Sequence, residues 1–332
     1  MSIWLVSGLI SVIFVISALC FKGVLLGYMM YLGGLFIATD IIRGIIWLVC
    51  RQTVVARAWD RLYSGGLLPL MLAFAFCVYA YYNAKKIRIT NYYIREEQFT
   101  KAQNNLRIVM LSDIHLGAGV KPGSLEKILE RVQQQKPDIV LLCGDVYEEN
   151  TTPAQYDASF NAFSRISARL GIYYVPGNHE YGAQQKNKLD IEQLACKLKN
   201  VGVTMLRDAA KLIDNSFYLV GRDDTAAGER KPLSALMEDI GAKLPVVLMG
   251  HRPVGLKEGE AQAVRLQLFG HTHAGQLFPT GKLRERLGRC EMLYGHRVSG
   301  CGSHTIVSSG VGTWGFSMRI GSPCEIVVVD MY

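Results

Sequence analysis

The chain has 332 residues, a formal net charge of +8 and hydrophobic side chains at 50% of its positions. This length predicts about two structural units. The basic residues are scattered and form no long Lys/Arg run, and no nucleic-acid-binding motif is present, so we expect no nucleic-acid partner. Residues 1–83 consist mainly of apolar side chains, whereas residues 84–332 have the composition of a globular protein.

Three apolar segments predict a multi-pass membrane region over residues 1–83. Ile3 to Phe21 contains 19 residues and no charge, which is enough to cross a hydrocarbon core of roughly 30 Å. A signal peptide is disfavoured, because no basic stretch precedes this segment and further apolar segments follow it. Gly23–Cys50 and Gly65–Asn83 are the second and third predicted helices. The bilayer is therefore an expected partner.

Charges within and around these segments bear on their placement. Asp40 and Arg43 lie on one face of the second predicted helix, where they would neutralise each other, either as an intramembrane site or at the membrane interface. Three spans place the globular part opposite the N-terminus. The flanking cations on the globular side are Lys22, Lys85, Lys86 and Arg88, and those on the other side are Arg51, Arg57 and Arg61. This excess predicts a cytoplasmic globular domain.

After a juxtamembrane linker over residues 84–105, residues 106–332 alternate between apolar strands and amphipathic helices. Leu106–Leu111 reads as a buried strand, and Ser124–Gln135 has apolar residues at helical spacing. Further strands are predicted over residues 138–143, 171–175, 244–249 and 264–269. This alternation predicts an α/β domain, in which ligands collect beyond the carboxyl ends of the strands.

A polar cluster follows each of five predicted strands. The clusters are Asp113-Ile-His115, Gly144-Asp145, Gly177-Asn178-His179-Glu180, Gly250-His251 and Gly270-His271-Thr-His273. Residues two apart in an extended segment point to the same side, so Asp113 with His115 and His271 with His273 can converge. Five of the seven histidines of the chain lie in these clusters. We therefore predict one shared metal site rather than five unrelated polar turns.

The kinds of ligand restrict the metal. Mixed carboxylate, imidazole and amide donors suit divalent Mn, Fe, Zn or Mg, and the absence of cysteine from the clusters argues against a structural zinc site. Seven candidate ligands exceed what one catalytic ion needs. Two ions about 3.5 to 4 Å apart, sharing one bridging carboxylate, would use all of them. Manganese is the favoured ion.

The ordered motifs D-x-H, G-D, G-N-H-E, G-H and G-H-T-H resemble those of the calcineurin-like metallophosphoesterase superfamily over residues 106–275. The resemblance implies a four-layer αββα sandwich and two metal-ligand sets bridged by Asp145. The first set is Asp113, His115 and His273, and the second is Asn178, His251 and His271. His179 resembles the residue that protonates the leaving oxygen. Arg252, directly after a ligand, is a candidate clamp for substrate oxygens.

The C-terminal part resembles a narrower subgroup. Residues 307–321, the following Glu325-Ile and the segment His273-Ala-Gly-Gln are similar to membrane-anchored members and to relatives that hydrolyse UDP-2,3-diacylglucosamine. Ala274 and Phe316-Ser317 depart from the subgroup's usual residues. Gly310–Gly315 matches the dinucleotide pattern G-x-G-x-x-G, but only 17 residues follow it, too few for the rest of that fold. We expect a glycine-rich loop near the metal site instead.

Taken together, the sequence predicts two-metal hydrolysis of a phosphoester or diphosphate bond, in an amphiphilic or lipid-linked substrate at the membrane. One alternative is a membrane-anchored phosphodiesterase for soluble substrates. Another is a metal-binding membrane scaffold or sensor without turnover, which the complete ligand set disfavours. The cysteines form no Cys-x-x-Cys pair, and a bridge between Cys290 and Cys301 would require an oxidising compartment.

Overall fold

The computed structural model describes residues 24–63, 66–96, 105–187, 190–238, 240, 244–288, 290–315 and 317–332. The chain divides into two compact units. One comprises Met1–Lys85 and Gly315–Ile320, and the other comprises Lys86–Trp314 and Gly321–Tyr332. We call them the helical unit and the catalytic domain and describe each by itself.

The described part of the helical unit contains three helices, α2 (Val24–Cys50), α3 (Val54–Tyr63) and α4 (Leu67–Lys85). Within it, Gly27–Val49 and Leu67–Lys85 are long and apolar enough to cross a membrane, with mean hydropathies of 1.8 and 1.5. These ranges agree with the second and third predicted helices. The helix predicted over Ile3–Phe21 lies outside the described residues.

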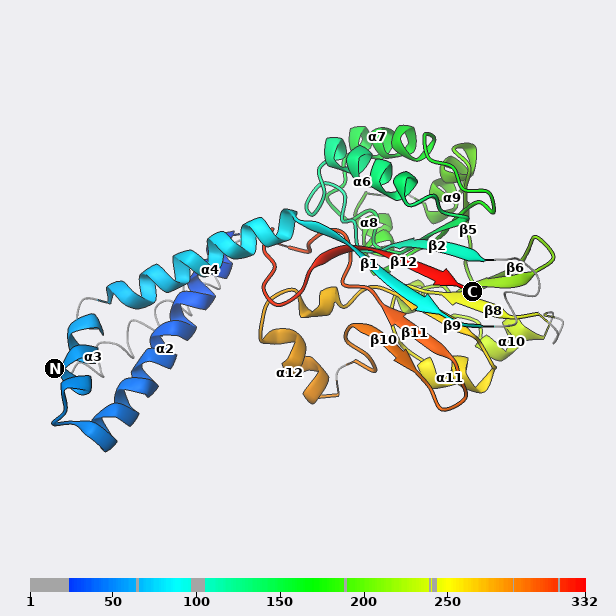
Figure 1. Ribbon diagram of the computed structural model, residues 1–332. Coiled ribbons are helices and arrows are strands. Elements are labelled where there is room, and N and C mark those ends of the chain that lie inside the picture. The colour runs from blue at the N-terminus through cyan, green and yellow to red at the C-terminus, as the bar shows by residue number, and fades with distance from the viewer. Residues whose placement is uncertain are drawn as a thin grey trace. The chain divides into compact units, whose positions relative to one another are not determined.

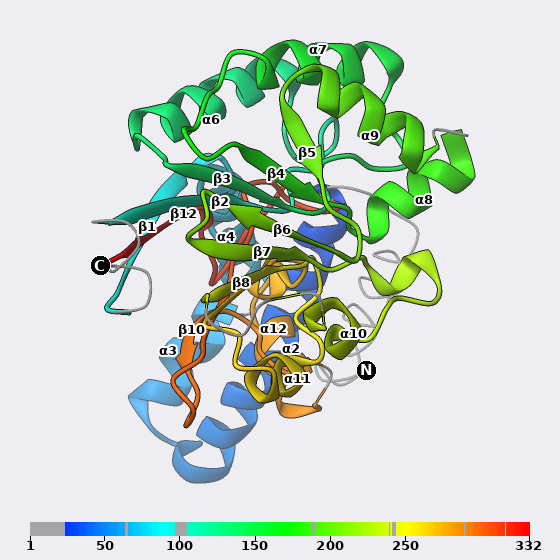
Figure 2. The ribbon, with the colours of Figure 1, turned by 90° about the vertical axis from the view of Figure 1, so that its right-hand side faces the viewer.

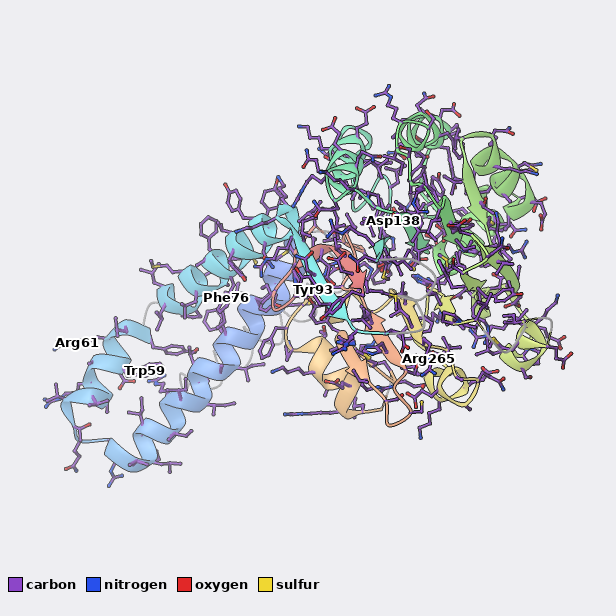
Figure 3. All side chains as sticks on the ribbon, turned by 45° about the vertical axis from the view of Figure 1, so that its right-hand side comes forward. Trp59, Arg61, Phe76, Tyr93, Asp138 and Arg265 are labelled. Carbon is purple, nitrogen blue, oxygen red and sulfur yellow. The ribbon has the colours of Figure 1, made fainter. Side chains whose placement is uncertain are left out.

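The polar residues of α2 make contacts with α3. The Nε of Arg43 lies 2.9 Å from the Asp60 carboxylate, and the Tyr63 hydroxyl donates to Asp40 at 2.6 Å. From the sequence, Asp40 and Arg43 were expected to be partners only of each other, because α3 is too polar to be read as part of the apolar region. An aromatic contact also joins α4 to α2, because the rings of Phe76 and Tyr31 stack with their centroids 6.2 Å apart. Figure 3 labels Phe76 on α4.

A segment from late in the chain, Gly315–Ile320, also belongs to the helical unit. The Arg319 backbone N–H donates to the Ala80 carbonyl at 3.0 Å, and the Asn83 side chain donates to the Arg319 carbonyl at 3.1 Å. The Met318 side chain packs against Gly27, where an added Cβ would lie 2.7 Å from its sulfur. The unit is therefore assembled from both ends of the sequence.

The catalytic domain contains two six-stranded sheets, visible edge-on in Figure 2. The first sheet has the order β1-β12-β2-β3-β4-β5, and the second has the order β10-β11-β9-β8-β7-β6. Both are parallel at their centres, from β2 to β5 and from β11 to β7. The strands of the first sheet are β1 (Ile87–Ile94), β2 (Leu106–Leu111), β3 (Ile139–Cys143), β4 (Ile172–Val175), β5 (Val203–Met205) and β12 (Cys324–Met331). Those of the second are β6 (Ala209–Ile213), β7 (Phe217–Gly221), β8 (Val246–Met249), β9 (Leu266–Phe269), β10 (Gly295–Val298) and β11 (His304–Val307).

Alternating strand residues build separate cores, because successive side chains point to opposite faces of a sheet. In β2, Ile108 and Met110 join the core between the two sheets, whereas Val109 and Leu111 face the helices outside. Those outer helices are α6 (Pro122–Gln134), α7 (Pro153–Phe163) and α9 (Ile191–Asn200), drawn above the sheet in Figure 2. On the far face of the second sheet lie α10 (Leu233–Met237) and α11 (Leu256–Ala261). The predicted four-layer αββα arrangement is confirmed.

The strand β1 corrects the expected domain boundaries. Residues 84–105 were expected to form a linker, yet Ile87–Ile94 pairs in parallel with β12 along its whole length (Figure 1). The sequence pattern did not indicate this strand, because most of its residues are not fully buried. In addition, a single residue separates it from the apolar helix α4. The sheet therefore begins almost where the helical unit ends.

A buried carboxylate of β12 holds the edge of this sheet to the loop behind the site. Glu325 is fully buried. It accepts hydrogen bonds from the Ser309 backbone N–H at 2.9 Å, the Tyr294 hydroxyl at 3.0 Å and the Thr90 hydroxyl at 2.5 Å. The Ser308 hydroxyl donates to it as well, at 3.2 Å, so this one side chain satisfies four groups on three different segments. A buried donor without a partner would cost free energy.

We predict that Glu325→Leu lowers the free energy of unfolding by about 2–4 kcal/mol, because these donors lose their acceptor inside the protein. Thermal unfolding of the full-length protein in detergent measures the loss as a lower Tm. Glu229→Leu, at an exposed loop position, is the matched control and leaves the Tm unchanged. Equal melting of both variants and the wild type would contradict the role given to Glu325.

Candidate metal centre

The predicted site residues lie at strand ends of both sheets. Asp113 and His115 follow β2, and Asp145 follows β3. Asn178 and His179 begin α8 (Asn178–Asn187) directly after β4. His251 follows β8, and His271 and His273 follow β9. The carboxyl edges of the two sheets thus supply one cluster.

Sharp turns, rather than extended strands, orient these side chains toward one another. Asp113, His115, Asp145, His271 and His273 all have φ between 48° and 71°, in the left-handed region that non-glycine residues seldom adopt. Asp113 and His115 do converge, as expected, but through these turns and not through the alternation of side chains along an extended segment. The chain turns at each ligand candidate, and such backbone strain is typical of functional sites.

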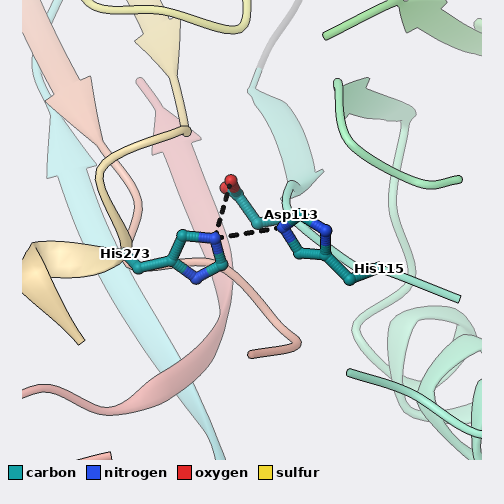
Figure 4. A group of neighbouring side chains, drawn as sticks. All are labelled: Asp113, His115 and His273. Atoms are coloured by element: carbon teal, nitrogen blue, oxygen red, sulfur yellow. Dashed lines mark hydrogen bonds and ion pairs between the residues drawn. The ribbon is translucent and has the colours of Figure 1, made fainter. Parts of the chain in front are cut away.

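Asp113, His115 and His273 form the first group of candidate metal ligands (Figure 4). The Nε2 atoms of His115 and His273 are 3.1 Å apart, and the His273 Nε2 lies 3.4 Å from Asp113 Oδ1. Asp113 and His115 are fully buried. Ring nitrogens that converge this closely with a carboxylate are arranged as donors around a cation.

Asp145, His251 and His271 form the second group. The Asp145 Oδ2 lies 3.0 Å from His251 Nε2, and His271 Nδ1 lies 3.2 Å from the same nitrogen. Asp145 Oδ2 is also 3.8 Å from His115 Nε2 in the first group. The carboxylate of Asp145 therefore lies between the two groups, where a bridging ligand is expected.

Asn178 completes the set of seven residues brought together. Its Oδ1 atom is buried and has no hydrogen-bond partner among the described residues. A neutral carbonyl oxygen that has lost water without gaining a donor is costly unless a cation takes the donor's place. The amide therefore fits the metal-ligand role that the sequence assigned to it.

Charges in the site favour a cation as well. Burial lowers the pKa of His271 to about 3, assisted by the positive charges of His251 and Arg252, so its ring is a neutral donor at pH 7. Burial acts to raise the pKa of Asp145, but His251 outweighs it and holds that pKa well below its usual range. Burial acts to lower the pKa of His251, but Asp145 raises it to about 10. A divalent cation would replace the proton that Asp145 otherwise draws onto His251.

Two glycines allow the ligand-bearing loops to approach each other. A Cβ at Gly177 would lie 2.3 Å from Asp145 Oδ1, and one at Gly270 would lie 2.4 Å from Asp113 Oδ2. The glycine-rich loop expected near the site is present too, because the Gly312 N–H donates to the Asp113 carbonyl at 2.8 Å. Side chains at these positions would push the ligands apart.

Glu180 has a positioning role that the sequence did not reveal. This buried carboxylate accepts from the backbone N–H groups of Asp145 at 3.0 Å, Tyr147 at 2.8 Å and Gly177 at 2.7 Å. It thereby joins the loop after β3 to the loop after β4. The feature of the sequence that could have indicated this role is its position directly after His179 in the G-N-H-E motif.

His179 lies beside the two groups and is oriented by a second unpredicted residue. Its Nδ1 is 2.9 Å from the Glu149 carboxylate, and its backbone N–H donates to Asp145 at 2.9 Å. The ring of Trp314 lies 6.0 Å from the His179 ring. Glu149 belongs to no motif, so only the fold brings it to the site. Trp314 belongs to the Gly310–Gly315 loop, which was expected near the metal site.

Arg252, predicted as an oxygen clamp, is held at the edge of the site. Its Nε lies 3.1 Å from the carboxylate of Asp224, which is almost fully buried. The Arg252 side chain is about one third exposed, and its charge acts on His271. The fixed guanidinium is therefore close to the second group, as a substrate-binding role requires.

Comparison with known proteins agrees with this geometry. Residues 106–275 match the family described as calcineurin-like phosphoesterase. An uncharacterized metallophosphoesterase of Aquifex aeolicus is 31% identical over 79% of this chain and 98% of its own length. A transmembrane protein with metallophosphoesterase domain from Danio rerio is 30% identical over 78% of this chain. The match spans only 61% of that protein's length.

A solved purple acid phosphatase from yellow lupin aligns with 63% of this chain and 44% of its own, at 12% identity and a TM-score of 0.42. That likeness is too distant to bear on activity. The matched residues of the family extend over the strand ends that carry all seven candidate ligands and His179. The chain belongs to the calcineurin-like phosphoesterase family and contains its phosphoesterase domain.

Proposed function

We propose that this protein hydrolyses a phosphoester or diphosphate bond of an amphiphilic, lipid-linked substrate at a membrane, using two divalent ions. The observation that carries the proposal is the pair of ligand groups with the Asp145 carboxylate between them, in a chain with two candidate membrane spans. Because a single residue separates α4 from β1, the catalytic domain stays beside any bilayer that α4 crosses.

The residues of the site support in-line attack by water on phosphorus. Divalent cations bound there would supply Lewis acidity and lower the pKa of water. Asp145, between the two groups, would offset the repulsion of two cations. Arg252 would bind a phosphoryl oxygen, and His179 would protonate the leaving oxygen while Glu149 holds its Nδ1.

The metal and the membrane placement are further parts of the proposal. Oxygen and imidazole donors without cysteine suit Mn, Fe, Zn or Mg, and we favour Mn. We place the chain as a multi-pass membrane protein with its catalytic domain in the cytoplasm, on the excess of flanking cations described above. Relatives named as transmembrane proteins with a metallophosphoesterase domain support the membrane location.

The substrate class is tested with full-length protein in detergent. A generic phosphodiester, a phosphomonoester and a UDP-linked acylated sugar are compared, with Mn added or all metal chelated. Preference for the acylated sugar over its deacylated form would support an amphiphilic substrate. Equal rates on both forms would instead favour the phosphodiesterase for soluble substrates, and absence of turnover with every metal would favour the scaffold.

We predict that Asp145→Asn lowers kcat/KM by more than about a hundredfold, because even residues that only support metal ligands contribute 10- to 100-fold. The variant keeps the shape of the side chain but loses the charge shared by the two groups. Asp157→Asn, at an exposed position of α7, is the control and retains full activity. Unchanged activity of Asp145→Asn at equal melting temperature would contradict the bridging role.

We predict that His179→Ala slows hydrolysis of substrates with alkoxide leaving groups by about 10²- to 10⁴-fold, the usual contribution of a general acid. Esters of p-nitrophenol are affected far less, because that leaving group departs without a proton. Glu149→Gln shows the same selectivity in weaker form, since it acts through His179. A uniform loss on both kinds of ester would argue against proton donation.

A further inference from the structure

One surface of the catalytic domain exposes large apolar side chains next to the site. Among its described residues, the large hydrophobics more than half exposed are Tyr93, Phe278, Leu283, Leu287, Val298 and Trp314. Phe278, Leu283 and Leu287 lie in α12 (Thr280–Arg286) or next to it. Trp314 is hydrogen-bonded to Gln276, shortly before that helix. Exposed apolar residues scattered singly need no explanation, but a cluster indicates an interaction surface.

Local structure holds this cluster together. Leu287 donates its backbone N–H to the Leu283 carbonyl, so the two leucines lie one turn apart on the same helix face. Phe278 precedes the helix by two residues. The Gln276 side chain bonds both backbone groups of Trp314, at 2.8 and 2.9 Å, and so ties Trp314 to the chain that leads into α12.

The cluster also carries positive charge. Lys282, Arg284 and Arg286 on α12 are all exposed, and with Glu285 they give Thr280–Arg286 a net charge of +2 (three cations less one anion). Phe, Leu and Trp beside Lys and Arg is the composition of segments that lie in the interface of an anionic bilayer. We call these seven residues the α12 face: Phe278, Leu283, Leu287, Trp314, Lys282, Arg284 and Arg286.

The α12 face adjoins the metal centre. The turn η2 (His273–Gly275), which begins with a candidate metal ligand, is followed within a few residues by Phe278. Trp314 at the other side lies 6.0 Å, ring to ring, from His179. A membrane in contact with this face would therefore lie next to the bond to be cleaved.

We propose that the α12 face inserts its apolar side chains into the surface of an anionic bilayer and thereby holds the active site against the lipid that carries the substrate. Charge complementarity selects the bilayer over a protein surface, and the single residue between α4 and β1 keeps the domain within reach of it. The proposal depends on the membrane location proposed above but not on hydrolysis, because its test reads lipid contact alone.

The test uses the full-length protein in vesicles of phosphatidylglycerol mixed equally with phosphatidylcholine, and in vesicles of phosphatidylcholine alone. The photo-reactive residue p-benzoylphenylalanine replaces Leu283 or, as the matched control, Leu212, an exposed leucine of β6 in the same domain. Illumination followed by mass spectrometry measures lipid adducts at each position. Unchanged melting temperatures show that both variants are folded.

We expect about fivefold or more lipid adduct at position 283 than at position 212, since only interfacial side chains lie within the acyl boundary. Phosphatidylcholine alone should give less adduct. The variant with Lys282→Glu, Arg284→Glu and Arg286→Glu should lose the dependence on phosphatidylglycerol. Equal labelling at positions 283 and 212 would overturn the proposal. Adducts formed mainly with a second copy of the chain would overturn it in favour of self-association.

Discussion

The buried carboxylate of Asp145 is the constraint on which the rest of the site depends. It lies between two groups of imidazole and carboxylate ligands, and each group draws its residues from both sheets. Burial disfavours the ionised form of this carboxyl group, and the positive charge of His251 favours it. The group therefore stays ionised only because cationic partners surround it. Glu180 fixes its backbone, and the N–H of His179 fixes one of its oxygens. The same contacts therefore set the positions of His179 and of Asp145.

The four-layer fold brings these parts together. Parallel strands at the centre of each sheet end on a common edge, and packing of the two sheets through one core places both edges at one site. Left-handed turns at the ligand candidates convert strand ends into inward-pointing side chains. Such turns cost free energy, and dense packing of the strands behind them supplies the stability that keeps them in place.

The metal-ligand candidates could be predicted because each lies in a short motif directly after an apolar strand. Strand and helix periodicity predicted an α/β domain, and the family resemblance implied its four layers. Glu149 could not be predicted, because it lies in no motif and reaches His179 only through tertiary folding. Trp314 lies in the glycine-rich loop expected near the site, but its contact with His179 also depends on the fold. The strand β1 directly follows an apolar helix, and its local pattern does not indicate that it pairs with β12. Likewise, nothing in the local pattern of Gly315–Ile320 indicates that it packs with helices far earlier in the chain. Hydrophobic periodicity predicts single helices and strands, whereas these contacts form between separate segments of the chain.

The central claim, that two divalent ions act together across Asp145, is tested most directly by metal stoichiometry. Metal-free full-length protein is titrated with Mn, and bound metal per chain and turnover are measured on the same samples. We predict that turnover rises only as the second equivalent binds and reaches its maximum at two ions per chain. Full turnover with one ion per chain, or binding of two ions without any turnover, would contradict the account.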